Sequence, residues 1–107
     1  MSKKILLLGL SDSILADAQQ QLARPDLEVF RGTSVEDVRS QLSRTTIDHV
    51  FMGGGLPTQP QLQMELVWAI FQASNKTTVH MLDTSSGPPG FVPFVRAILR
   101  GLANDEG

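Results

Sequence analysis

The sequence predicts a single α/β domain over residues 1–107, a three-layer α/β/α sandwich built on a four-stranded parallel sheet. Three observations support this fold class. Short runs rich in branched and aromatic residues alternate four times with segments of helical periodicity, which is typical of repeated strand–helix units. The first run is apolar throughout, as expected for a central parallel strand that is buried on both faces. A chain of 107 residues is large enough for one core and leaves no room for a second domain.

The first strand–helix unit is predicted at residues 4–9 and about 13–24. Ser11 or Asp12 would cap the helix, and Pro25 would end it. The residues expected on its buried face are Ile14, Leu15, Ala18 and Leu22.

The second strand, residues 27–30, alternates apolar and polar side chains and is therefore expected at an edge of the sheet. A capping box formed by Thr33 and Glu36, or by Ser34 and Asp37, is expected to start the next helix. Its narrow apolar stripe consists of Val35, Val38 and Leu42.

The third strand is expected at residues 47–52 and its helix at about 61–74. This helix is unusual because its apolar residues occupy more than half of its circumference, which one sheet face cannot cover. We therefore expect Trp68, with Met64 and Phe71, to contact a second subunit or a partner. The alternative is that a neighbouring helix and the preceding loop cover the excess.

The fourth unit consists of a strand at residues 77–82, a turn-rich loop at 83–90 and a helix at 91–102. Residues 104–107 are expected to fray. The residues expected to face the core from this helix are Phe91, Phe94, Val95, Ile98, Leu99 and Leu102.

Right-handed crossovers and the edge character of the second strand predict the strand order 2-1-3-4, as in flavodoxin-like sheets. Any ligand should then bind where the loops after strands 1, 3 and 4 meet. The candidate ligand-binding residues in these loops are Ser11, Asp12, Gly53, Gly54, Gly55, Asp83 and Thr84. Each also has a structural interpretation: the serine as a helix cap, the glycines as residues of a tight loop, and Asp83 as the cap of its own turn.

The third strand and the loop after it resemble the receiver domain of bacterial response regulators. Asp48, the glycine triplet at 53–55 and Leu56-Pro57 have the spacing of that family's motif, with Gly53 at the position of the phosphoacceptor aspartate. Gly87 stands where the family has a lysine. The family's fourth helix and fifth strand have no counterpart, so the resemblance indicates a truncated fold.

This resemblance implies a divergent receiver-like domain that is not phosphorylated at Gly53 and acts through protein contacts. Without a fifth strand, the fourth would be an edge at which Val79 and Met81 present backbone groups without a neighbouring strand. Together with the wide third helix, this favours a homodimer, or binding of another protein, through Met64, Trp68, Phe71, Val79 and Met81.

The competing hypothesis is a small-anion-binding protein or an enzyme. His49 and His80 fall on strands expected to be neighbours, but a catalytic zinc site would need Asp48 or Asp83 as a third ligand. A hydrogen-bonded, partly buried imidazole is the more common arrangement. Neither a dinucleotide-binding nor a phosphate-loop motif is present, so we expect no metal, no cofactor and no catalytic residue.

Charge and composition limit the kinds of partner and the cellular compartment that we expect. A formal net charge of −2 gives no indication of a nucleic-acid surface. The absence of cysteine excludes disulfides and thiol chemistry and suits a reducing compartment. The apolar run after Lys3-Lys4 ends at Leu10, too early for a signal peptide, and no segment has the length of a membrane span, so a cytoplasmic location is expected.

Overall fold

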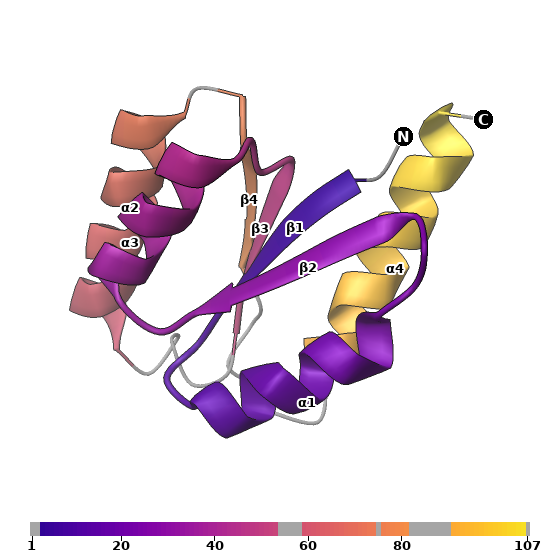
Figure 1. Cartoon of the computed structure of the whole chain (residues 1–107), viewed down its shortest axis with the longest axis horizontal. Helices are drawn as coiled ribbons and strands as arrows, with labels where there is room; N and C mark the ends of the chain where they lie inside the picture. The colour runs from indigo at the N-terminus through magenta and orange to yellow at the C-terminus, as the bar shows by residue number, and fades with distance from the viewer. Residues whose placement is uncertain (1–2, 54–58, 75, 82–90, 107) are drawn as a thin grey trace.

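The computed structural model describes residues 3–53, 59–74, 76–81 and 91–106 of the chain. The strands form one parallel sheet with the predicted order β2-β1-β3-β4 (Figure 1). Their bounds are Lys3–Leu8 for β1, Leu27–Gly32 for β2, His49–Met52 for β3 and Thr78–Met81 for β4. The second strand lies at one edge, as its alternating sequence predicts.

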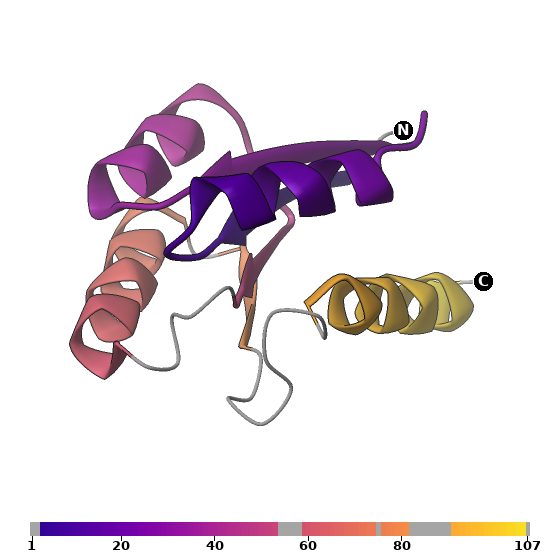
Figure 2. The ribbon, with the colours of Figure 1, turned by 90° about the horizontal axis from the view of Figure 1, so that it is seen from below.

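Helices cover both faces of the sheet, which confirms the three-layer α/β/α sandwich (Figures 1 and 2). Helices α1 (Asp12–Leu22) and α4 (Phe91–Glu106) pack on one face, and α2 (Val35–Arg44) and α3 (Pro60–Ala73) pack on the other. In the described part of the chain, none of these helices combines the length and hydrophobicity that crossing a membrane requires.

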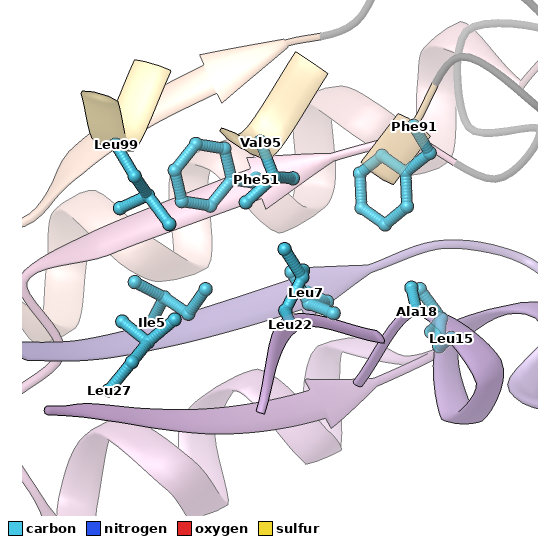
Figure 3. Packing of buried hydrophobic residues seen from close by; sticks show 10 residues of the cluster. All are labelled: Ile5, Leu7, Leu15, Ala18, Leu22, Leu27, Phe51, Phe91, Val95 and Leu99. Atoms are coloured by element: carbon cyan, nitrogen blue, oxygen red, sulfur yellow. The ribbon is translucent and has the colours of Figure 1, made fainter. Parts of the chain in front are cut away.

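The central strand β1 divides the core into two halves. Ile5 and Leu7 point toward α1 and α4, whereas Leu6 and Leu8 point toward α2 and α3, and all four side chains are fully buried. Figure 3 shows the first half, in which Ile5 and Leu7 lie between side chains of α1 and α4. A parallel strand that is covered on both faces is apolar at nearly every position. The continuous apolar sequence of β1 therefore predicted its place at the centre of the sheet.

Several predicted boundaries are wrong by a few residues. Helix α4 continues to Glu106, past the predicted end at Leu102. No proline or glycine follows Gly101 until the last residue, and each added helical residue gains a hydrogen bond without a new nucleation step. Strand β3 begins at His49 rather than at residue 47, although Ile47 is buried.

Candidate functional site

The predicted ligand site begins where β1 and β3 end side by side. The backbone N–H of Gly53 donates to the carbonyl of Leu8 (3.0 Å), so both strands leave the sheet at the same edge. Four of the candidate residues, Gly54, Gly55, Asp83 and Thr84, lie outside the described residues. The structure therefore describes three of the seven predicted positions: Ser11, Asp12 and Gly53.

Ser11 and Asp12 are held by contacts within the protein. Ser11 is the N-cap residue of α1, but its hydroxyl lies 3.0 Å from the hydroxyl of Ser13 and makes no side-chain capping bond. The Asp12 carboxylate accepts a hydrogen bond from Arg31 Nε (2.9 Å) on β2. Because β2 and β3 lie on opposite sides of β1, this ion pair draws the carboxylate toward the strand farther from Gly53.

Gly53 is glycine because an aromatic ring lies directly against it. A Cβ built at this position would be 2.5 Å and 2.7 Å from two ring carbons of Phe91, the first residue of α4. Phe91 is 1% exposed and cannot move outward without leaving the core (Figure 3). The position that resembles a phosphoacceptor therefore has no room for any side chain while Phe91 occupies its present place. The helical periodicity of the sequence assigns Phe91 to the core but gives no signal of this contact.

The two histidines lie together on the α4 face of the sheet. Phe51 on β3 pairs with His80 on β4, which places His49 diagonally across from His80 on the same face. His49 Nδ1 is 3.2 Å from His80 Nε2, and the Phe51 ring stacks on the His80 ring at a centroid distance of 4.8 Å. Burial, followed by the proximity of His49, lowers the pKa of His80 below its ordinary value of 6.5. Among the described residues, no third histidine or carboxylate joins them to form a cluster of metal ligands. Asp48 instead accepts a hydrogen bond from the backbone N–H of Lys4 (2.9 Å).

Large apolar side chains are exposed on α3 and β4, at the residues predicted to form an interface. Met64, Trp68 and Phe71 are 65%, 65% and 59% exposed and share the outer face of α3, while Met81 on β4 is 54% exposed. Gln63 Nε2 donates to Met81 Sδ (3.0 Å), so the helix and the strand meet in one surface. We call Met64, Trp68, Phe71 and Met81 the α3–β4 surface.

Val79 contributes to this edge differently from the other predicted interface residues. Its side chain is partly buried against the core between α2, α3 and the sheet. The N–H of Thr78 donates to the carbonyl of Asp48, and backbone groups alternate in direction along a strand, so the N–H and C=O of Val79 and Met81 point away from β3. Within the described residues, no strand lies on that outer side of β4.

A hollow of about 290 Å³ lies at the opposite edge of the sheet, between the end of α1 and α4. Arg24 pairs with Asp26 (2.9 Å) there, and Arg96 donates to the carbonyl of Gln21 (2.9 Å), so two of its arginines have partners within the protein. The hollow is lined by Leu22, Arg24, Leu27, Arg96, Leu99 and Arg100.

In comparisons with protein-family models, curated proteins and solved structures, nothing matches this chain.

Proposed function

We propose that this chain is a receiver-like regulatory domain without phosphotransfer activity, which acts by forming a homodimer through the α3–β4 surface. The observation that carries the proposal is the outer face of α3. Met64, Trp68 and Phe71 follow one another at spacings of four and three residues, which places them on one face, and each is more than half exposed. An exposed apolar cluster of this kind marks an interaction surface.

Charge and backbone geometry favour a second copy of the chain as the partner. Glu65 is the only charged residue in the sequence of α3, and the cores of protein interfaces are depleted in charge. A neutral apolar surface meets its own copy across a two-fold axis without repulsion between like charges. The outward N–H and C=O groups of Val79 and Met81 are suited to pairing with the same strand of a second copy.

The competing function, binding of a small anion at the carboxyl edge of the sheet, has less support. Asp12 is already paired with Arg31, and the ring of Phe91 covers Gly53. The backbone N–H of Gly53 donates to Leu8, and the negative charge of the Asp12 carboxylate repels an anion. We therefore favour the interaction domain over a binding protein or an enzyme.

The test is the mass of the protein in solution, measured by sedimentation over a range of concentrations. The parent chain should have the mass of two chains, and Trp68→Glu should shift it to one by weakening association by about 2 kcal/mol or more, roughly 30-fold. Gln20→Glu, which adds the same charge at an exposed position of α1, should leave the mass unchanged. A monomeric parent chain, or a Trp68→Glu variant that dimerises like the parent, would refute the proposal.

A further inference from the structure

The distance between His49 Nδ1 and His80 Nε2, 3.2 Å, matches the separation of two ligands of one metal ion. Two zinc–nitrogen bonds of about 2.0–2.1 Å to atoms 3.2 Å apart enclose an angle of about 100°, close to the tetrahedral value. An ordinary hydrogen bond between two neutral imidazoles explains the same distance in the metal-free protein. The two arrangements use the same pair of nitrogen atoms, so one can replace the other.

The sheet holds these rings in place before any metal arrives. The register of β3 and β4 fixes the diagonal positions of the two histidines, and stacking on Phe51 fixes the plane of the His80 ring. The two imidazole rings are tilted by 38° with centroids 5.3 Å apart, so they are not stacked on each other.

We propose that His49 Nδ1 and His80 Nε2 bind one late first-row divalent metal ion, such as Zn²⁺, with water completing its coordination. Imidazole nitrogen is a preferred ligand of these ions. Both side chains are partly buried rather than fully enclosed. This inference concerns a single chain and does not depend on dimerisation.

Binding requires a change of tautomer rather than the loss of a proton. In the neutral pair, one of the two facing nitrogens carries hydrogen and donates to the other. That hydrogen must move to the other nitrogen of the same ring, which leaves both facing lone pairs available to the metal.

A bound ion would also cross-link the edge strand β4 to β3. Strand β4 has four residues and pairs with β3 along one side. A metal bonded to His49 on β3 and to His80 on β4 would link the two strands directly. We therefore expect Zn²⁺ to raise the melting temperature by several degrees, since it binds the folded arrangement and not the separated strands.

The composition of the chain permits a clean test. The sequence contains two histidines and no cysteine, so these two rings are its only imidazole or thiolate ligands. Untagged protein is titrated with Zn²⁺ by calorimetry, and the imidazole signals are followed by NMR. We expect one ion per chain, simultaneous shifts of both rings, and no response to Mg²⁺, which prefers oxygen ligands.

Single variants distinguish chelation from two separate weak sites. His49→Asn and His80→Asn should each lower Zn²⁺ affinity by more than the roughly 10–100-fold that loss of an outer-shell partner costs. Asp48→Asn, which changes the neighbouring charge and keeps both imidazoles, should retain the parent affinity within a few fold. The NMR titration of the parent chain provides the answer even if a histidine variant fails to fold.

Three results would overturn the proposal. The first is an absence of imidazole shifts at zinc concentrations up to about 1 mM. A dissociation constant of about 1 mM corresponds to a binding free energy of only about 4 kcal/mol. The second is a shift of one ring alone, or single variants that bind like the parent. The third is one ion per two chains, which would place the metal between molecules.

Discussion

At the scale of single residues, Gly53 shows how a tertiary contact determines the chemistry of a sheet edge. The resemblance to receiver domains that we draw from the sequence aligns Gly53 with their phosphoacceptor. A glycine at this position is compatible with a binding role and with a structural one. A Cβ added at Gly53 would lie only 2.5 Å and 2.7 Å from ring carbons of Phe91, which favours the structural role. The contact joins residues 38 positions apart in the sequence, so local pattern does not reveal it.

Gly53→Ala is accordingly expected to destabilise the fold by about 1–3 kcal/mol, the usual cost of overpacking a core. Gly101→Ala is the matched control, because nothing lies within 4 Å of a Cβ at this exposed position of α4. That substitution should stabilise by about 0.5–1 kcal/mol through helix propensity. Urea denaturation of both variants measures the difference. Equal and small effects would show that Phe91 yields easily to a side chain at position 53.

At the scale of elements, the helix starts illustrate what a local pattern can predict. Half of the Ser34–Asp37 capping box is present: Ser34 Oγ accepts from the N–H of Asp37 (3.1 Å). The return bond of the Asp37 carboxylate comes from the N–H of Thr33 (2.9 Å), one residue before the N-cap residue Ser34. Ser11 has the predicted position at the start of α1 without the capping bond. Capping chemistry is local in both cases, but the sequence does not reveal whether a hydroxyl finds a competing neighbour such as Ser13.

Ser34→Ala should therefore cost about 1 kcal/mol of stability, because it leaves the N–H of Asp37 without its side-chain acceptor. Ser11→Ala removes a hydroxyl at the equivalent position of α1 and should stay within about 0.5 kcal/mol of the parent. Thermal unfolding of the two variants under one set of conditions makes the comparison. A loss at Ser11 as large as that at Ser34 would contradict the assignment of the two caps.

An excess of apolar surface on α3 was predictable because its apolar stripe is wider than one sheet face can cover. Leu66, Ala69 and Ile70 are buried, whereas Met64 and Trp68 are exposed, so the structure divides the apolar residues of α3 into two groups. Periodicity alone indicated an excess of apolar surface. Which residues form that excess depends on the position of α3 relative to the sheet, which is a tertiary property.

At the scale of the whole molecule, the strand order followed from physical rules that need no tertiary information. The uninterrupted apolar run of β1 placed it at the centre, the alternation of β2 placed it at an edge, and crossover handedness fixed the rest. The partners of individual polar groups did not follow in the same way. Arg31 forms an ion pair with Asp12, and its guanidinium also donates a hydrogen bond to the side-chain oxygen of Gln19. Sequence periodicity alone would leave Gln19 in solvent.

The pH dependence of unfolding reports on the environments of two titratable side chains, His80 and Asp37. Burial and then the proximity of His49 lower the pKa of His80 below 6.5, so the unfolded chain binds this proton more readily. Its contribution to stability is complete above pH 6.5 and is lost as the pH falls toward the lowered value. Hydrogen bonding, led by the backbone N–H of Thr33, lowers the pKa of Asp37 below 3.8, so a second loss begins as the pH falls through 3.8.

We therefore expect the free energy of unfolding, measured in urea from about pH 8 to about pH 3, to decrease in two separate steps. His80→Asn should flatten the upper step and leave the lower one, whereas Asp37→Asn should flatten the lower step and leave the upper one. Asp37→Asn keeps the size of the side chain, whereas His80→Asn also removes the ring that stacks on Phe51. A loss of packing lowers stability equally at every pH, so the test is the shape of each pH profile and not its height. If the stability of the parent chain stays constant through pH 6.5, the folded protein does not disfavour the charged form of His80 relative to water, and the expected lowering of its pKa is contradicted.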